Sequence, residues 1–363
     1  GFVRQGMKFM STLMKGKRGL VMGVANNHSI AWGIAKTLAD HGAELAFTYQ
    51  GDALKKRVEP LAAEVGSKFL LPCDVEDLSS VDAVFDEIKA QWGTFDFLVH
   101  AIAYSDKNEL KGRYVETSRQ NFLSTLNISC YSFTDVARRA APLMQKGGSL
   151  ITLTYGGASR VMPNYNVMGV AKAALEASVR YLANDYGPQG IRVNAISAGP
   201  VRTLAGAGIA DARLMFNYQK RHAPLRRTVS IEEVGGSALY LLSDLSKGVT
   251  GEIHYVDSGY NIISMPSPEA LKTVDAAETA AENNAALSAS QRCLPVIAGR
   301  INATQRPAPK SNATMHPPAE RSPFPASKRQ VQIRFPAWSV PLKSLSQTPA
   351  DQYSPTGWSA RKI

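Results

Sequence analysis

The sequence predicts an α/β fold, in which helices cover both faces of a doubly wound, mostly seven-stranded parallel sheet. Short apolar runs alternate along the chain with segments of helical period. The runs are apolar throughout, as in strands buried on both faces, rather than alternately apolar and polar. Glycine or polar residues follow several runs, at the strand ends where ligands of such sheets bind. These observations predict one α/β domain.

The first part of this domain is predicted to contain four strands and three helices. Each helix ends near a glycine, which is a common stop signal. The second helix is predicted in spite of Pro60 in its interior. The expected strands span residues 18–24, 44–50, 68–75 and 95–104, and the expected helices span residues 29–42, 53–66 and 80–93.

The second part begins with a helical region at about residues 117–145. The remaining strands are expected at residues 148–155, 191–197 and 251–257, with a long helix at about 164–186 and another near 231–243. Because ligands bind at the carboxyl ends of parallel strands, residues just after the strands mark the expected site. These residues are Gly23, Gln50, Asp74, Ile102, Tyr155 and Gly199.

The composition changes near residue 266. Residues 279–363 hold 11 of the 20 prolines, and their 11 Lys and Arg against 3 Asp and Glu contribute +8 of the formal net charge of +11. This segment has no apolar period and few large side chains to offset the entropy of ordering. The expected layout is an unstructured leader (1–14), a domain (15–265) and a low-order, Pro-rich basic tail (266–363).

Charge, cysteine content and hydropathy argue against several classes of function. Residues 1–278 keep only +3 of the net charge, which gives no reason to expect a nucleic-acid groove. Cys73, Cys130 and Cys293 are too few and too widely spaced for a disulfide framework or a zinc site, and a reducing cytoplasm fits them best. We expect no metal and no membrane span, since no run of about 18 apolar residues occurs.

The segment GVANNHSIAWGIA joins the first predicted strand to the first helix. Gly23 lies in the turn, and backbone amides at the helix start could bind a pyrophosphate. Ser29 either caps the helix or donates to a phosphate, and the pattern leaves both open.

Residues at the ends of the next two strands could bind the rest of a nucleotide. Gln50 could hydrogen-bond a ribose hydroxyl, which favours NADH over NADPH. The basic residues 55–57 could instead receive a 2′-phosphate, or could form a solvated helix face. Asp74 could accept from an adenine amine or simply lead into the next helix, and Val75 would supply backbone contacts.

Tyr165 and Lys172 lie seven residues apart in the predicted long helix. Seven residues turn a helix by about 700°, so both side chains are expected on one face, about 10 Å apart along the axis. A core tyrosine and a surface lysine would give the same spacing, so the interval alone assigns no chemistry. His100, at the end of the fourth strand, is expected to be a satisfied core histidine.

The segments YNVMGVAKAAL, VNAISAGPVRT and GVANNHSIAWGIA together resemble the short-chain dehydrogenase/reductase superfamily. Within it they resemble the enoyl-acyl-carrier-protein reductase branch of bacterial type II fatty-acid synthesis, over about residues 15–265. Ketone-reducing members have a tyrosine four residues before the lysine, where this chain has Met168, which cannot donate a proton. This departure fits the enoyl-reducing branch.

The resemblance implies a Rossmann-type domain that reduces the 2,3 double bond of trans-2-enoyl thioesters on acyl carrier protein, the last step of the elongation cycle. It implies NADH as cofactor, with NADPH less favoured, and a homotetramer packed partly through the helices near 120–145 and 165–186. Tyr165 would donate to the enolate oxygen, and Lys172 would hold the nicotinamide ribose. Tyr155 would form the wall of the acyl pocket and could have a secondary polar role.

The resemblance also implies the remaining site residues by their positions in these motifs. A lid over the acyl chain is expected at residues 204–215, and basic residues near it would dock the acidic carrier: Arg202, Lys220, Arg221, Arg226 and Arg227. The expected cofactor-binding residues are Gly23, Ser29, Ile30, Gln50, Asp74, Val75, Ile102, Lys172, Val201, Arg202, Thr203, Leu204 and Ala205. The expected substrate-binding residues are Ser105, Tyr155, Met168, Ala205, Ile209 and Met215.

Two other functions remain open at this point. A ketone-reducing short-chain dehydrogenase, acting on 3-ketoacyl thioesters, would share the fold, although Met168 argues against it. A non-catalytic nucleotide-binding regulator, with a basic tail that contacts nucleic acid, would share the cofactor site. Turnover of a crotonyl and a 3-ketoacyl thioester with NADH would separate the two enzymes, and filter binding to nucleic acid would test the regulator.

Overall fold

A computed structural model describes residues 12–201, 203 and 212–267. All of these lie in the first of the two units into which the chain divides, Gly1–Leu294 and Pro295–Ile363. They form one sheet of seven parallel strands: β1 (Arg18–Met22), β2 (Glu44–Tyr49), β3 (Phe69–Pro72), β4 (Phe97–His100), β5 (Gly148–Thr154), β6 (Ile191–Ala198) and β7 (Ile253–Val256). The order is β3-β2-β1-β4-β5-β6-β7, so the predicted doubly wound sheet is confirmed.

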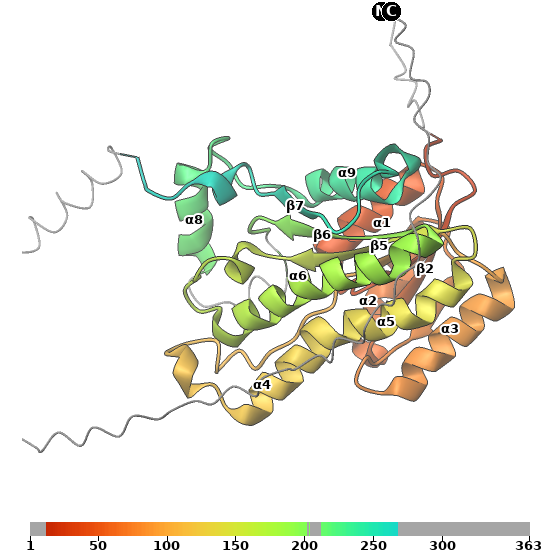
Figure 1. Cartoon of the computed structure of the whole chain (residues 1–363), viewed down its shortest axis with the longest axis horizontal. Helices are drawn as coiled ribbons and strands as arrows, with labels where there is room; N and C mark the ends of the chain where they lie inside the picture. The colour runs from red at the N-terminus through yellow and green to blue at the C-terminus, as the bar shows by residue number, and fades with distance from the viewer. Residues whose placement is uncertain (1–11, 202, 204–211, 268–363) are drawn as a thin grey trace, which may run out of the picture. The chain divides into compact units, whose positions relative to one another are not determined.

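Helices connect the strands and cover both faces of the sheet. The helices are α1 (Ile30–Asp40), α2 (Gly51–Glu64), α3 (Leu78–Trp92), α4 (Arg119–Leu126), α5 (Ser132–Ala140), α6 (Asn166–Tyr186), α8 (Ala212–His222) and α9 (Ile231–Leu242). Figure 1 shows α1 and α9 on one side of the sheet and α5 and α6 on the other. As predicted, α2 continues through Pro60.

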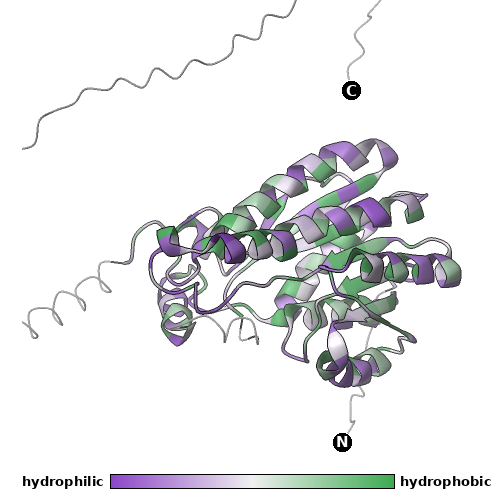
Figure 2. Ribbon diagram, turned by 90° about the horizontal axis from the view of Figure 1, so that it is seen from below, coloured by the Kyte–Doolittle hydropathy of each residue, from purple (hydrophilic) through white to green (hydrophobic). Residues whose placement is uncertain are grey.

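The sheet separates two apolar cores. Leu20 and Met22 of β1 pack into the core with α3, α5 and α6, whereas Val21 between them packs into the core with α1, α2 and α9. Successive strand residues point to opposite faces, so a strand buried on both faces must be apolar at each position. Figure 2 shows these hydrophobic strands enclosed between helices that are partly hydrophilic. Burial on both faces therefore explains the uninterrupted apolar runs.

The fourth strand is shorter than predicted, whereas the long helical region that follows it is present and changes its helix type along its length. The strand expected at 95–104 is shorter, because after His100 the chain leaves the sheet: the N–H of Tyr104 donates to Ser129 Oγ, which donates to Tyr104 O, both at 2.9 Å. The helical region expected at 117–145 is present: α4, the π-helical turn η2 (Asn127–Tyr131), α5 and the 3-10 turn η3 (Ala141–Leu143) follow one another without a break. A side chain on η2 thus captures the backbone that would otherwise have extended β4.

Glycines allow α1 and α9 to pack closely. A Cβ on Gly33 would lie 2.5 Å from the backbone oxygen of Ile231, and one on Gly235 would lie 2.3 Å from Thr37 Oγ1. Only a residue without a side chain permits these approaches. The contact places the start of α9 beside the loop after β1, where His28 and Ile231 line the same cavity.

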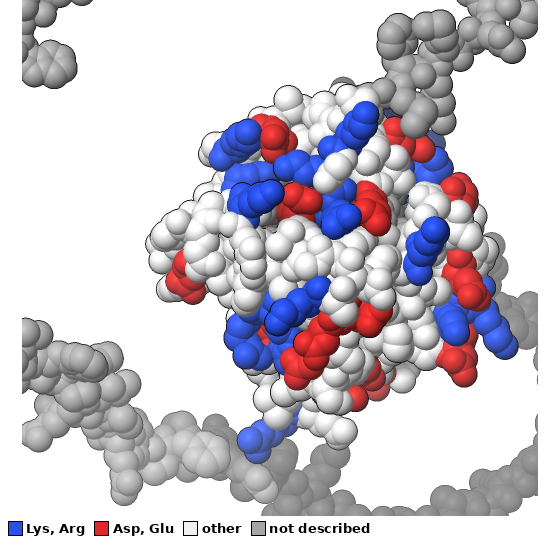
Figure 3. Space-filling model, turned by 90° about the vertical axis from the view of Figure 1, so that its right-hand side faces the viewer, with Lys and Arg blue, Asp and Glu red and all other residues white. Residues whose placement is uncertain are grey.

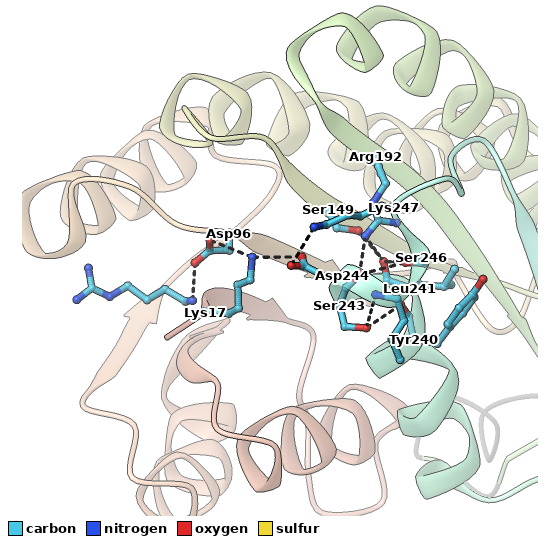
Figure 4. A network of polar contacts seen from close by, with 12 residues as sticks. Lys17, Asp96, Ser149, Arg192, Tyr240, Leu241, Ser243, Asp244, Ser246 and Lys247 are labelled. Atoms are coloured by element: carbon cyan, nitrogen blue, oxygen red, sulfur yellow. Dashed lines mark hydrogen bonds and ion pairs between the residues drawn. The ribbon is translucent and has the colours of Figure 1, made fainter. Parts of the chain in front are cut away.

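A polar network joins the amino ends of the strands (Figure 4). Lys17 Nζ lies 3.5 Å from Asp244 Oδ1 and 3.9 Å from Asp96 Oδ1. Arg192, in β6, donates to the backbone oxygen of Leu241 at 2.7 Å. These contacts tie β1, β4 and β6 to the end of α9, at the edge away from the carboxyl ends of the strands.

The described surface carries charges of both signs. On the face shown in Figure 3, Lys and Arg side chains are interspersed with Asp and Glu. Exposed ion pairs such as Arg18 with Glu44, at 3.0 Å, contribute little to stability because solvent screens them. None of the helices in residues 12–201 or 212–267 is long and apolar enough to cross a membrane.

Candidate active site

The loops after β1 and β4 meet at the carboxyl edge of the sheet. Gly23, directly after β1, has a φ of +97°, and a Cβ there would lie 2.1 Å from the backbone oxygen of Ala101. Glycine fits because the turn combines a left-handed backbone with a close approach. The predicted turn after the first strand is therefore present, at the edge where doubly wound sheets bind their ligands.

Ser29 stabilises the loop rather than the helix. It occupies the N-cap position of α1, but its side chain makes no cap hydrogen bond. Instead Ser29 Oγ accepts from the backbone N–H of Ala25 at 3.0 Å and of Asn26 at 3.1 Å. The amino terminus of α1, which favours anions through its amides and dipole, thus faces the loop without a side-chain cap.

Gln50 and Asp74, from the ends of β2 and β3, are in direct contact. Gln50 Nε2 donates to Asp74 Oδ2 at 3.0 Å, and Asp74 Oδ1 accepts from the N–H of Glu76 at 3.0 Å. The N–H of Asp74 in turn donates to Ser80 Oγ at 2.9 Å. The two residues predicted for the adenosine half thus form one polar unit on adjacent strands.

Four predicted cofactor residues are apolar and half-buried near this edge. Val75 and Ile102 pack at the border of the core with α3, α5 and α6. Ile30 and Val201 pack at the border of the core with α1 and α9. Each therefore keeps part of its surface accessible at the loops where a nucleotide would bind.

Tyr155 and Tyr165 pack against each other at the ends of β5 and α6. Their ring centroids are 5.1 Å apart, with planes at 71°. Burial raises the pKa of both hydroxyls above the ordinary value, to about 12 for Tyr155. Both phenols therefore remain protonated near neutral pH and can donate hydrogen bonds.

Tyr165 precedes the long helix instead of lying inside it. α6 begins at Asn166, and Tyr165 is its N-cap residue, with φ −118° and ψ −23°. The helix therefore begins slightly later than the predicted start near 164. The single helical face calculated for Tyr165 and Lys172 does not apply, because Tyr165 lies outside α6. Its carbonyl still accepts from the N–H of Met168 and Gly169, so the phenol stands at the first turn of α6.

Two glycines that the sequence interpretation missed position the Tyr165 ring. A Cβ on Gly157 would lie 2.4 Å from Tyr165 Cδ1, and one on Gly169 would lie 2.9 Å from the backbone oxygen of Gly157. The only signal in the sequence was a pair of glycines just after Tyr155. That pair could equally have marked an ordinary turn.

Lys172 is a buried residue, not a surface lysine. Its side chain is 6% exposed, and Nζ donates to the backbone oxygen of Leu153 at 2.7 Å. Burial lowers the pKa of Lys172 to about 8. An ammonium group of lowered pKa beside the end of β5 is a candidate to bind a polar ligand.

His100 is a core residue, as predicted. Its ring is fully buried, with Nδ1 3.1 Å from Thr152 Oγ1 and Nε2 2.9 Å from Ser132 Oγ. Burial lowers the pKa of His100 to about 3, so it is neutral at physiological pH. With both ring nitrogens engaged, His100 serves the packing of β4, β5 and α5.

A separate apolar cluster surrounds Tyr165. Its buried members are Leu110, Tyr165, Val167 and Met168, with Tyr155, Met162, Phe122 and Leu126 half-buried around them. Met168 thus belongs to the same buried cluster as Tyr165. Ser105 is bonded to α4 instead: it donates to Asn121 Oδ1 at 3.3 Å and accepts from Thr125 Oγ1 at 2.9 Å.

The loop after β6 is described only in part. Arg202, Leu204, Ala205 and Ile209 lie outside the described residues, as does most of the expected lid at 204–215. The N–H of Thr203 donates to Val201 O at 2.8 Å, and Met215 is half-buried on α8. A cavity of about 520 Å³ lies between this loop, α8 and the start of α9.

A second, smaller cavity behind Tyr155 was not predicted. It measures about 60 Å³, and its lining includes Arg160, Gln219, Asp257 and Tyr260. Gln219 Nε2 donates to the backbone oxygen of Asp257 at 2.9 Å. These residues lie far apart in the sequence, so no local motif could have indicated their contact.

These features fit a dinucleotide cofactor. The Gly23 turn and the α1 amino terminus suit a pyrophosphate, Gln50 and Asp74 suit an adenosine, and buried Lys172 suits a ribose. With a tyrosine at the start of the lysine-bearing helix, the fold and site define a short-chain dehydrogenase/reductase, a class of nicotinamide-dependent oxidoreductase.

Comparison with known proteins narrows this class to one family. A family model described as enoyl-(acyl carrier protein) reductase matches residues 23–261, and the chain belongs to this family. It is 74% identical over 267 residues to enoyl-acyl-carrier-protein reductase (NADH) 2 of Rhizobium meliloti (strain 1021), covering 74% of this chain and 100% of the relative. It is 59% identical over 251 residues to the NADH enzyme FabI of Rickettsia typhi, covering 69% of this chain and 96% of the relative.

Solved structures agree with this family. FabI from Candidatus Liberibacter asiaticus is 63% identical, with a TM-score of 0.70 over 71% of this chain and 100% of that one. The enoyl reductase from Anaplasma phagocytophilum in complex with NAD is 58% identical, with a TM-score of 0.69 over 71% of this chain and 98% of that one. The predicted enoyl-reductase branch is therefore confirmed.

Proposed function

We propose that this chain uses NADH to reduce the 2,3 double bond of trans-2-enoyl thioesters on acyl carrier protein, the last step of the fatty-acid elongation cycle. Relatives named as NADH-dependent enoyl reductases, at 74% and 59% identity, support this activity. The observation that carries it is the buried phenol of Tyr165, packed on Tyr155 at the start of the helix that bears Lys172.

Tyr165 is assigned as the hydrogen-bond donor to the oxyanion, the thioester oxygen that becomes negatively charged during the reduction. When NADH is bound, it supplies a hydride to the β-carbon of the enoyl group. Negative charge then accumulates on the thioester oxygen, and a donor aimed at this oxygen stabilises the transition state more than the ground state. Burial raises the pKa of Tyr165, so its hydroxyl stays protonated and donates a hydrogen bond to this oxygen, while a proton from water adds to the α-carbon and completes the reduction. The Tyr155 ring holds that phenol edge-on and forms the wall of the acyl pocket.

Lys172 is assigned to the nicotinamide ribose. An ammonium group has three donors, and one of them is used by Leu153 O. The other donors can bind ribose hydroxyls, and the charge lies near the end of β5, where the reacting carbons would be held. The remaining cofactor assignments are those of the sequence: Gly23, Ser29 and Ile30 for the pyrophosphate, and Gln50, Asp74, Val75 and Ile102 for the adenosine.

Met168 argues against a ketone-reducing enzyme. It stands four residues before Lys172, where such an enzyme needs a proton donor, and its thioether is 7% exposed in the cluster around Tyr165. NADH oxidation should therefore proceed with a crotonyl thioester and not with a 3-ketoacyl thioester. Turnover of the ketoacyl thioester alone would refute the proposal, and turnover of neither would favour a regulator.

The basic residues of α8 are proposed to dock the acidic carrier protein. Lys220 and Arg221 are exposed on its last turn, whereas Arg227 pairs with Glu233 at 2.6 Å. Exposed charges of this kind accelerate encounter with an acidic partner. Replacing Lys220 and Arg221 by Gln should raise KM for the carrier-linked substrate while leaving KM for the crotonyl thioester unchanged.

A homotetramer and a cytoplasmic location complete the proposal. Apolar side chains are exposed on η2 and on the helices expected to pack between subunits: Leu123 at 56%, Tyr131 at 53% and Tyr181 at 72%. Such a surface favours burial against other copies of the chain. Light scattering of the full chain should give four times the monomer mass, and a monomer at working concentration would contradict this part. We place the catalytic domain at residues 15–265 together with Met14, which is buried in the core with α1, α2 and α9 and so does not belong to the expected unstructured leader.

A further inference from the structure

The charge environment of Lys172 is defined by three elements. His100 approaches from β4, Cys130 from η2 and Glu176 from α6 itself. Burial keeps His100 neutral, and burial also raises the pKa of the Cys130 thiol, so neither offers a negative charge near neutral pH. Of these groups, Glu176 is the one that can balance the buried ammonium.

Glu176 lies one helical turn beyond Lys172. Residues four apart share a helix face, so the carboxylate and the ammonium lie on the same side of α6. Glu176 is half-buried, and its Oε1 accepts from Thr154 Oγ1 at 2.8 Å. Burial raises the pKa of Glu176, and the hydrogen bond from Thr154 and the exposed Arg180, one turn further, partly oppose this rise.

Thr154 connects this carboxylate to the active site. It is the last residue of β5, 5% exposed, and it precedes Tyr155 directly. Lys172 bonds to the preceding residue of the same strand, through Leu153 O. The lysine and the glutamate of α6 therefore hold successive residues of β5, just before the tyrosine pair.

We propose that Glu176 is a positioning residue of the reductase: its carboxylate keeps Lys172 in the ammonium form, and its bond to Thr154 fixes the end of β5 beneath Tyr155. A buried cation is costly unless a nearby anion offsets the lost hydration. This inference rests on the proposed role of Lys172 in NADH binding. It adds a residue that touches neither cofactor nor substrate.

The two roles of Glu176 can be separated by mutation. Glu176→Gln removes the charge but keeps an acceptor for Thr154, whereas Thr154→Val removes the hydroxyl but leaves the charge. Glu176→Asp retains the charge and serves as the conservative rescue. Glu176→Met gives a second neutral variant that buries no amide, in case the glutamine variant folds poorly.

The test is the dissociation constant of NADH, measured by fluorescence with the full chain from about pH 6 to about pH 10, a range that brackets ordinary and lowered lysine pKa values. In the unchanged chain, affinity should fall as pH rises through about 8, where Lys172 loses its proton. In the two neutral variants the midpoint should lie about one pH unit lower, since the ammonium has lost the carboxylate on its own helix face. Glu176→Asp and Thr154→Val should keep the midpoint, and Thr154→Val should lower kcat.

The outcomes distinguish this inference from the proposed function. If the unchanged chain loses affinity near pH 8 but both neutral variants keep the same midpoint, the role of Glu176 is wrong and that of Lys172 stands. If Lys172→Met binds NADH as tightly as the unchanged chain at every pH, the ribose assignment itself fails. Circular dichroism and thermal unfolding of each variant show which proteins are folded and can be compared.

Discussion

The ring of Tyr155 meets the ring of Tyr165 edge-on, with centroids 5.1 Å apart, although one residue follows a strand and the other precedes a helix. Edge-to-face contacts are favoured because the positive edge of one ring meets the negative face of the other. The second ring therefore fixes the first at the junction of β5 and α6. Substitutions that move either ring should alter catalysis more than they alter stability.

Replacing Tyr165 by Phe should slow the chemical step while leaving the fold intact. The phenyl ring preserves the contact with Tyr155, and only the hydroxyl is lost. Removing one donor to an oxyanion costs on the order of 3 kcal/mol, so kcat should fall about a hundredfold. Steady-state kinetics with a crotonyl thioester would measure this loss. A kcat within a factor of two of the unchanged chain would exclude Tyr165 from the oxyanion role.

Gly157→Ala should disturb the same phenol indirectly. The new Cβ would lie 2.4 Å from Tyr165 Cδ1, so the ring must move away from its present position. We expect kcat to fall about tenfold or more, because small displacements of a catalytic group are costly. Gly156→Ala is the matched control, since a Cβ there meets nothing within 4 Å. Equal losses in both variants would point to the backbone rather than to the ring.

The sheet could be predicted because its signal is local. Leu20, Val21 and Met22 are apolar in sequence since each faces a core, and this holds for any strand buried on both sides. The end of β4 could not be predicted, because Ser129, 25 residues away, captures the backbone of Tyr104. When a distant residue sets the end of a strand, the apolar segment of the sequence does not show where that strand ends.

The site shows the same division between local and distant effects. The turn at Gly23 could be predicted from its place after a strand. The burial of Lys172 could not, because its spacing from Tyr165 fits a surface lysine equally well, and only packing against β5 distinguishes the two. The contact between Gln50 and Asp74 likewise depends on β2 and β3 being neighbours in the sheet.

Deleting residues 279–363 should leave reductase turnover unchanged. The family match ends at residue 261, and the proposed catalytic residues all precede this point. The deletion also removes +8 of the net charge, so any binding to nucleic acid through the tail should disappear with it. Turnover of a carrier-linked enoyl substrate and filter binding to nucleic acid would test the two statements separately. A truncated chain that is folded but inactive would show that the tail contributes to catalysis.

His100 should make the free energy of unfolding depend on pH in the acidic range. Its pKa is about 3 in the folded chain, whereas an exposed histidine titrates near 6.5. The unfolded chain therefore binds a proton that the folded chain does not bind. The contribution of His100 to the free energy of unfolding is fully present above about pH 6.5 and is lost as pH decreases toward 3, by up to about 1.4 kcal/mol per pH unit.

Urea unfolding at pH 7 and pH 5 would measure the slope; these conditions lie above most carboxyl pKa values, at about 4. His100→Gln should be less stable at pH 7, because it disturbs the bonds to Thr152 and Ser132, but its stability should change less between the two pH values. An identical slope in both proteins would show that another group is responsible.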